Sequence, residues 1–365
     1  MSRPAPANPA LGAVRGRGAL SNPAGRYEAA AVDAFDDGWG IDPRAESAPR
    51  TVVTEEQARS VINYNSSPDL NFDRSINPYR GCEHGCVYCY ARPTHGYLGL
   101  SSGLDFETRL FAKVNAAAVL AAELRKKAYV PAPIALGVNT DAWQPIERKY
   151  QITRAVLQTL LEFGHPVQTI TKSALVWRDL DVLGALAKRN LVQVMVSVTT
   201  LDAALARDLE PRTALPQRRL ELIAGLAQAG VAVGVMAAPM IPQLNDHELE
   251  QILAQAYAAG ARRASYVLLR LPHELDALFD QWLQAHRPLR ASHVWQQNHS
   301  MRQGVDQAEF GTRMRGTGLL AELLQQRFTK AARRLGYDSA PRKLELGQFQ
   351  PPPLPSAQLT LFGDQ

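Results

Sequence analysis

The sequence of 365 residues has no cysteine outside residues 82–89, where all three of its cysteines lie. An odd number of cysteines and an N-terminus without an apolar leader segment do not favour a disulfide-stabilised secreted protein. No apolar run approaches the length that crosses a bilayer. From these absences we expect a cytoplasmic protein with reduced cysteines and no membrane partner.

Long basic tracts and phosphate-binding loops are also absent. Residues 262–343 hold 14 Lys and Arg against 7 Asp and Glu within a net charge of +5, but no five basic residues are consecutive. No G-x-G-x-x-G segment follows a predicted strand, which excludes a Rossmann phosphate loop. The basic C-terminal third therefore predicts either a polyanionic partner such as nucleic acid or an ordinary solvated helical surface.

What the sequence does contain is a cysteine motif, C-x3-C-x2-C, formed by Cys82, Cys86 and Cys89. Thiolates are soft ligands that select zinc, copper(I) or iron–sulfur clusters. Three thiolates leave one iron of a four-iron cluster without a protein ligand, or leave one position of a zinc ion to fill. A zinc site would need His84 or His95, since no second cysteine pair exists. The spacing favours an iron–sulfur cluster over zinc.

The cysteine motif resembles the signature of the radical S-adenosylmethionine (SAM) superfamily, in which an aromatic residue, here Tyr88, precedes the last cysteine. The wider string over residues 77–92 resembles the branch of spore photoproduct lyase-like or "DNA repair photolyase"-like proteins. The resemblance extends over residues 70–270. It implies an enzyme with a [4Fe-4S] cluster whose open iron is bound by the amine and carboxylate of SAM.

The same resemblance implies a reaction and a partner. The reduced cluster would cleave SAM, and the 5′-deoxyadenosyl radical would remove a hydrogen atom from a substrate. A small electron-transfer protein of the flavodoxin or ferredoxin type would supply the electron. The basic residues Arg80 and Arg92, which flank the cysteines, are expected to tune the anionic cluster.

Short apolar strands alternate with amphipathic helices through the middle of the chain. The six predicted strands cover residues 74–79, 133–138, 167–170, 191–198, 231–238 and 264–269. Six such strand–helix pairs predict an α/β fold, either a partial (β/α)6 TIM-like barrel or a doubly wound open sheet. The resemblance implies the partial barrel, in which functional groups gather at the C-terminal ends of the strands.

The segments on either side of this alternation differ from it in composition. Residues 1–53 are rich in Pro, Ala, Gly and Arg without periodicity, which predicts a flexible N-terminal arm. A short helix is predicted over residues 54–63. The sequence thus predicts three parts: the arm, a core barrel over residues 70–286, and a helical C-terminal extension over residues 287–365 with a helix at 319–335.

Polar residues follow the second and third predicted strands, and the resemblance implies that some of them bind SAM. The superfamily usually has a Gly-Gly-Glu-like segment after the second strand, where this chain has Asn139, Thr140 and Asp141. Their oxygens can accept hydrogen bonds from the SAM amine, although an Asx turn towards Trp143 explains them as well. Lys172, after the third strand, can pair with the SAM carboxylate.

The fourth predicted strand is followed by a second group of candidate SAM contacts. A hydroxyl of Ser197 or Thr199 can contact the carboxylate or the ribose of SAM. Glu210 can accept from the ribose hydroxyls and Arg212 can hold the carboxylate, and either Arg218 or Arg219 can serve in place of Arg212. The plain alternative is a salt bridge between Glu210 and Arg212.

The resemblance leaves the substrate open. Spore photoproduct lyase uses an additional cysteine to return a hydrogen atom to its product, and this chain has none. Tyr79, Tyr90 or Tyr97 can take that role or merely pack, and Trp295 can stack on a base or cap the barrel. We therefore expect a radical reaction on an unidentified substrate. The alternatives are repair of a DNA lesion, and a cluster- or zinc-containing nucleic-acid-binding protein without SAM turnover.

Overall fold

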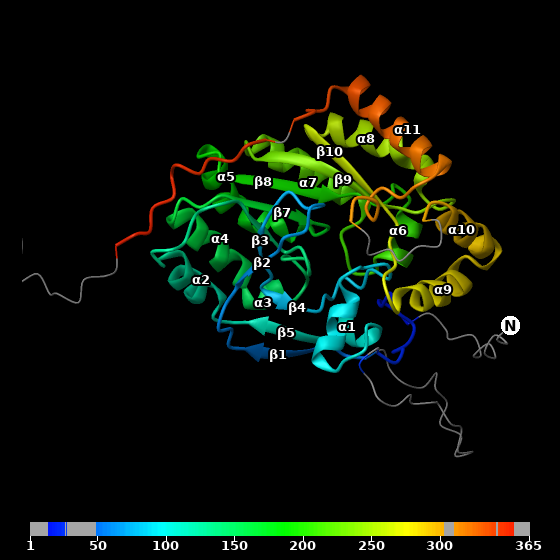
Figure 1. Cartoon of the computed structure of the whole chain (residues 1–365), viewed down its shortest axis with the longest axis horizontal. Coiled ribbons are helices and arrows are strands. Elements are labelled where there is room, and N and C mark those ends of the chain that lie inside the picture. Colours follow the sequence, from blue (N-terminus) through cyan, green and yellow to red (C-terminus); the bar gives the residue numbers. More distant parts are fainter. Residues whose placement is uncertain (1–13, 26, 28–48, 303–309, 341, 354–365) are drawn as a thin grey trace, which may run out of the picture.

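A seven-stranded sheet forms the centre of the computed structural model, which describes residues 14–25, 27, 49–302, 310–340 and 342–353 (Figure 1). Its strands are β2 (Ile62–Tyr64), β3 (Arg74–Ile76), β6 (Ile134–Leu136), β7 (Val167–Thr171), β8 (Val192–Ser197), β9 (Ala232–Met240) and β10 (Arg263–Leu268). Their order in space is β10-β9-β8-β7-β6-β3-β2. All neighbours from β3 to β10 are parallel, and β2 pairs with β3 in the antiparallel direction.

The strand order distinguishes a partial barrel from a doubly wound sheet. From β3 to β10 the spatial order follows the chain order without reversal, whereas a doubly wound sheet reverses at a switch point. Right-handed crossovers that all run in one direction place the connecting helices on one face of the sheet. The predicted α/β fold with a partial (β/α)6 TIM-like barrel is confirmed, with β2 and β10 as the two edges of the sheet.

Helices cover the outer face of this sheet. The helices that follow the parallel strands or extend their layer are α2 (Ala116–Leu124), α3 (Glu147–Tyr150), α4 (Ile152–Glu162), α5 (Leu180–Lys188), α7 (Pro216–Gln228), α8 (Leu249–Ala258) and α11 (Leu319–Leu335). The helix α6 (Ala203–Leu209) also follows a parallel strand, but its Leu205 and Leu209 pack in the apolar cluster that contains Cys86. Contacts join α2 to α4, α4 to α5, α7 to α8, and α8 to α11. Leu160 of α4, Ile223 of α7 and Val194 of β8 belong to the single large core between the layers.

Further helices lie at the ends of the barrel strands. They are α1 (Leu104–Thr108), α9 (Leu275–His286), α10 (Pro288–Ser300), and the 3-10 turns η1 (Arg92–Leu98), η2 (Ala174–Asp179) and η3 (Asp246–Glu248). Of the helices in the described ranges, none is long and apolar enough to cross a membrane.

A small second sheet supports the cysteine motif. It consists of β1 (Val52–Glu56), β5 (Arg109–Lys113) and β4 (Tyr79–Arg80), in the order β1-β5-β4, at the lower edge of Figure 1. The predicted strand over residues 74–79 is therefore divided between two sheets. The helix predicted over residues 54–63 is wrong, because the β-branched residues that begin β1 find a parallel partner in β5.

Part of the predicted N-terminal arm is packed against the body. Within residues 14–25, Arg17, Ala19 and Leu20 are buried, so the expectation of flexibility fails for this stretch. Residues 1–13, 26 and 28–48 of the predicted arm lie outside the described residues. At the other terminus the predicted helix over 319–335 is confirmed as α11, and the main chain of Gln350 donates to the carbonyl of Phe163.

Candidate functional site

The cysteine loop follows β4 and turns sharply at two glycines. Gly81 and Gly85 have φ of 73° and 68°, in the left-handed region that favours glycine. A side chain at Gly81 would also place its Cβ 2.8 Å from the carbonyl of Phe106. The backbone N–H of Cys82 donates to that same carbonyl over 2.9 Å. The loop conformation is thus fixed by contact with α1 and not by the motif alone.

Two of the three cysteines of the loop are shielded from water. Cys82 and Cys86 are buried, and Cys89 is partly exposed. Burial raises the pKa of all three thiols, and the charges of Asp141 near Cys82 and Glu210 near Cys86 raise the pKa of those two further. Thiolates in such a setting need a compensating cation, which a bound metal centre supplies.

The donors among the described residues do not form a site for a single metal ion. Across the part of the chain that the structure describes, no three His, Cys, Asp or Glu side chains converge on a point that one metal ion could occupy. His84 faces Asp141 with Nδ1 3.4 Å from Oδ2, and His95 Nε2 lies 2.9 Å from the carbonyl of Arg109. Neither histidine is therefore placed to complete a zinc site. In a four-iron cluster each thiolate binds a different iron, so the sulfurs need not meet at one point.

Lys172 extends from the C-terminal end of β7 towards the cysteine loop. Its Nζ donates to Ser197 Oγ over 2.7 Å and lies 3.8 Å from Glu210 Oε1 and 5.9 Å from the centre of the Tyr88 ring. Burial lowers the pKa of Lys172, and the charge of Cys86 opposes that shift. Because an ammonium carries three N–H donors, this lysine has donors left for an anionic ligand.

A buried carboxylate organises the wall beside Lys172. Glu210 is buried, and its side chain accepts from Thr199 Oγ1 over 2.5 Å, from the Tyr88 hydroxyl and from the Arg219 guanidinium. Burial raises the pKa of Glu210, although the charge of Arg219 opposes the shift. Arg219 also donates to the carbonyl of Ser197 over 3.0 Å. Glu210 is thus saturated by protein donors, which leaves little capacity for the predicted ribose contact.

The salt bridge between Glu210 and Arg212, the alternative to SAM contacts by these two residues, is not formed. Arg212 instead donates to Glu83 Oε1 over 2.6 Å, so it is paired with a residue inside the cysteine motif. Arg218 is exposed and pairs with Glu221 one helical turn away. Of the three arginines in this part of the sequence, the structure selects Arg219 as the buried partner of Glu210.

The segment after β6 is held mainly by internal bonds. Asp141 accepts from Thr171 Oγ1 over 2.8 Å and from the backbone N–H groups of Lys172 and Trp143 over 2.8 and 2.9 Å. The bond to Trp143 is the Asx turn that was the alternative to SAM binding. Thr140 Oγ1 donates to the carbonyl of Tyr79 over 3.3 Å. Asn139 Nδ2 has only a long contact of 3.5 Å to a threonine hydroxyl, so it is the residue of this segment with the most capacity for a ligand.

The two flanking arginines have different environments. Arg92 is fully buried and donates to the carbonyl of Cys86 over 2.9 Å and to the carboxylate of Glu107. Arg80 is largely exposed and pairs with Glu56 of β1 over 2.8 Å. Arg92 therefore fixes the backbone of the cysteine loop, whereas the structure gives Arg80 no comparable bond to the loop interior. Glu107 was not anticipated, because nothing in its local sequence distinguishes it.

The aromatic residues that were candidates for a functional role differ in burial and in hydrogen bonding. Tyr79 is buried and donates to the carboxylate of Glu147, and Tyr97 is exposed on η1. Tyr90, next to the last cysteine, donates to the carbonyl of Val138 at the end of β6 and is half exposed. Trp295 Nε1 donates to Asp280 Oδ1 over 2.7 Å, which agrees with packing at the end of the barrel.

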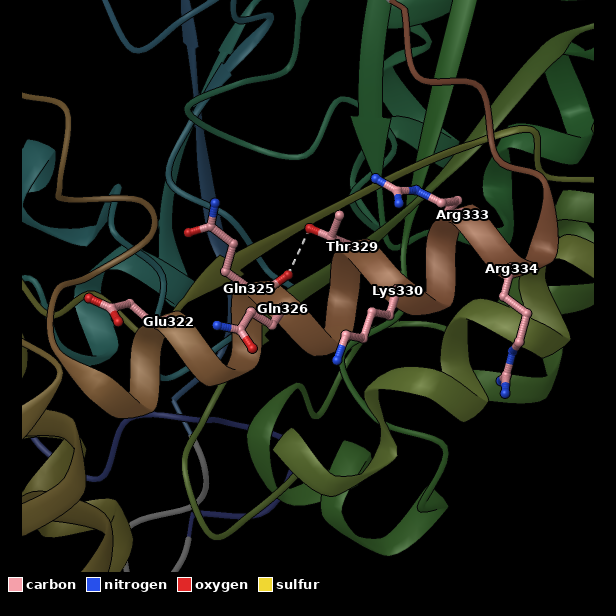
Figure 2. A pocket seen from close by; sticks show the side chains of 7 residues that line it. All are labelled: Glu322, Gln325, Gln326, Thr329, Lys330, Arg333 and Arg334. Carbon is pink, nitrogen blue, oxygen red and sulfur yellow. Dashed lines mark hydrogen bonds between the residues drawn. The ribbon is translucent and has the colours of Figure 1, made fainter.

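A surface hollow of about 640 Å³ lies along α11, remote in sequence from the cysteine loop. Figure 2 shows that Lys330 and Arg334 point to one side of the helix and Arg333 to the other. The cationic groups do not converge on a common ligand position. The polyanionic partner predicted for the basic C-terminal third stays a prediction.

Comparisons with known sequences agree with the cysteine motif. The sequence model described as the radical SAM superfamily matches residues 76–256. An uncharacterised protein of Mycobacterium tuberculosis is 41% identical over 221 residues, which are 60% of this chain and 65% of that protein. An uncharacterised protein of Methanocaldococcus jannaschii is 27% identical over 199 residues, 54% of this chain and 70% of that protein. The chain thus spans slightly less than two thirds of its mycobacterial relative.

Comparison with solved structures agrees with the barrel. A variant of spore photoproduct lyase superposes with a TM-score of 0.54 at 17% sequence identity, over 78% of this chain and 80% of that one. At this level of identity the similarity establishes a shared fold. The cysteine motif, the strand order and the superposition therefore describe the same architecture.

Proposed function

Because this chain belongs to the radical SAM superfamily through residues 76–256, we propose that it is an enzyme that cleaves SAM reductively at a [4Fe-4S] cluster. Cys82, Cys86 and Cys89 would hold the cluster. The observation that carries the proposal is the position of the three cysteines at the C-terminal ends of the barrel strands, with the charges of Cys86 and Cys89 acting on the ammonium of Lys172.

The bound cluster and SAM supply the radical chemistry, and the protein supplies orientation and exclusion of water. Lys172 would bind the carboxylate of SAM. The hydroxyl of Ser197, which accepts from Lys172 Nζ over 2.7 Å, would hold the lysine ammonium in position. Asn139 would accept from the SAM amine. Arg92, through the carbonyl of Cys86, would hold the loop in the conformation that presents the thiolates.

Tyr88, Thr199, Glu210 and Arg219 would form the wall of the SAM site. Their mutual hydrogen bonds support a positioning role, in which Glu210 fixes the aromatic ring that lies under Lys172. Arg212 and Asp141 would act on the cysteine loop through Glu83 and His84 respectively. An electron carrier of the flavodoxin or ferredoxin type completes the proposal.

An anaerobic reconstitution tests the proposal. The protein is loaded with iron and sulfide, iron and zinc are counted, dithionite and SAM are added, and 5′-deoxyadenosine is measured by chromatography. We expect about four irons per chain, as a [4Fe-4S] cluster requires, and 5′-deoxyadenosine that depends on the reductant. Zinc in place of iron, or an intact cluster without SAM cleavage, would contradict the proposal.

A further inference from the structure

Residues 14–25, here called the N-terminal strap, lie directly on the cysteine loop. In Figure 1 this strap is the dark blue segment beside α1 and α9. A Cβ added at Gly18 would lie 1.8 Å from the carbonyl oxygen of Gly85, so the two backbones touch. Ala19 is buried in the same apolar cluster as Cys86 and Val87. The strap therefore covers the middle of the cysteine motif.

One buried carboxylate joins the strap to the loop. Glu107, fully buried on α1, accepts from the backbone N–H groups of Gly18 over 3.1 Å and Ala19 over 2.8 Å. The same carboxylate accepts from the guanidinium of Arg92, which in turn donates to the carbonyl of Cys86. A continuous chain of hydrogen bonds thus runs from the strap to a cluster cysteine.

A second connection reaches the loop from the other side. Arg17 donates to the carbonyl of Glu107 over 3.0 Å and to Thr51 Oγ1 over 3.0 Å. Thr51 Oγ1 donates to Glu83 Oε1 over 2.5 Å, and Glu83 lies inside the cysteine motif. The strap therefore holds the motif at Cys86 and at Glu83 together.

A second glutamate, Glu123, shows how the contacts of Glu107 differ from the ordinary anchoring of a backbone segment. Glu123 of α2 also accepts from two consecutive backbone N–H groups, those of Val61 and Ile62, over 3.1 and 3.0 Å. That carboxylate anchors β2. The two glutamates thus make the same kind of backbone contact, but Glu107 also holds the arginine that contacts Cys86.

We propose that the N-terminal strap is a built-in cover of the cysteine loop and that Glu107 is the positioning residue that keeps it closed. The cover holds the backbone of Cys86 and excludes water from its thiol. The effect of the cover on a bound cluster rests on the proposed function, whereas the shielding of Cys86 does not. Since solvent exposure and hydrogen bonding around the sulfurs set the behaviour of iron–sulfur clusters, opening the cover should change both stability and spectrum of the bound cluster.

The first test uses the metal-free protein and so does not depend on the cluster. The rate of alkylation of Cys86 by iodoacetamide is measured by peptide mass spectrometry in the native chain and in Glu107→Gln, Gly18→Val and Arg17→Gln. Removing a charged partner of buried N–H groups should raise local opening, and hence alkylation, about tenfold in Glu107→Gln. Glu123→Gln, which removes the same kind of backbone contact at a half-buried carboxylate, is the control and should leave the rate unchanged.

Gly18→Val acts by steric displacement and keeps Glu107, so it should raise the alkylation rate even if Glu107→Gln folds poorly. Arg17→Gln removes only the second connection and should have a smaller effect. Unchanged alkylation of Cys86 in all three folded variants would overturn the proposal. So would an equal acceleration in Glu123→Gln.

The second test uses the reconstituted protein. Bleaching of the cluster in air and the electron paramagnetic resonance spectrum of the reduced cluster are compared between the native chain, Glu107→Gln and Glu123→Gln. Faster bleaching and an altered spectrum only in Glu107→Gln support the cover. A native chain that binds no cluster refutes the proposed function, whereas normal cluster binding with no difference among variants refutes the cover alone.

Discussion

The two ends of the barrel strands bury polar groups in different ways. At the C-terminal ends, Lys172, Glu210 and Arg219 bring charges of both signs together beside the cysteine loop. At the N-terminal ends, the neutral ring of His165 accepts from the Tyr129 hydroxyl over 2.7 Å and donates from Nδ1 to a backbone carbonyl over 2.9 Å. Phe349 of the C-terminal extension packs on this ring edge-on.

This difference separates function from stability. Buried charges carry a desolvation cost that a well-packed apolar group avoids, so a cluster of charges of both signs at the C-terminal ends suggests a role beyond holding the fold. At the N-terminal end of β3 the guanidinium of Arg74 is also buried, but it pairs with the exposed carboxylate of Asp73. Neutral groups that satisfy each other at the opposite end stabilise the barrel at little cost. We therefore expect changes at the C-terminal ends to affect the cofactors, and changes at the N-terminal ends to affect unfolding alone.

The largest effect should come from the cysteines. Replacing Cys82, Cys86 or Cys89 with alanine should abolish cluster binding, because no other cysteine exists to replace the lost ligand. Iron content and the visible absorbance after reconstitution measure this loss. Phe349→Ala, at the opposite end, should retain the full iron content. A cysteine variant that keeps the full chromophore would contradict the assignment, and loss of iron in Phe349→Ala would break the comparison between the two ends.

Arg219→Met tests the buried ion pair at the C-terminal ends. The change leaves the carboxylate of Glu210 buried without its guanidinium partner, and the ammonium of Lys172, 3.8 Å away, is beyond hydrogen-bond distance. This loss should lower the free energy of unfolding by about 3–5 kcal/mol. Urea denaturation measures it. The neighbouring Arg218→Met removes an exposed pair and should change stability by less than about 1 kcal/mol. Equal effects of the two changes would show that Glu210 does not depend on Arg219.

His165→Gln tests the N-terminal ends through pH. Burial lowers the pKa of His165 from 6.5 to about 4. As the pH falls through this interval, the unfolded chain gains a proton that the folded chain does not, so the native protein should lose up to about 3 kcal/mol of stability from this group. The variant should lack this loss, and urea denaturation at pH 7 and pH 4.5 compares the two.

The exposed His247→Gln is the control for that experiment and should follow the native pH dependence. If His165→Gln also keeps the native dependence, the ring does not stay neutral in the folded protein. Iron content should be unaffected in either histidine variant. An unchanged iron content would sharpen the contrast between the two ends of the strands, because it would separate the stability of the barrel from the cofactor site.

Lys172→Met should produce the smallest of these effects. Loss of one charge-assisted hydrogen bond should weaken SAM binding about 10- to 100-fold while the cluster remains. Equilibrium binding of SAM to the reconstituted protein, together with iron counting, measures both. Lys188→Met on α5 is the control and should bind SAM normally. Unchanged SAM affinity in Lys172→Met would show that this lysine is structural.

The parallel α/β fold was predictable because its signal is local, and the cysteine ligand set stays a prediction of the same local kind. Three cysteines within eight residues define a ligand set wherever the loop lies, and alternating apolar strands and helices predict the parallel α/β fold. The direction of the strand order, which separates a partial barrel from a doubly wound sheet, was available only through the family resemblance. Periodicity describes each element, but it does not describe which strands become neighbours.

Partner choice was decided by the tertiary structure. Glu210 pairs with Arg219 and not with Arg212, which is two residues away, because the α7 helix turns Arg219 inward while Arg212 lies against Glu83. The tertiary structure also decided that the N-terminal strap is packed, although its composition predicts a flexible arm. Its anchor, Glu107, is nearly ninety residues away in the sequence. Hydrogen bonds and ion pairs of this kind depend on which distant segments of the chain the fold brings together. The sequence alone determined that three thiols share one loop and that strands and helices alternate, while only the fold decided which polar groups are satisfied by other groups of the protein.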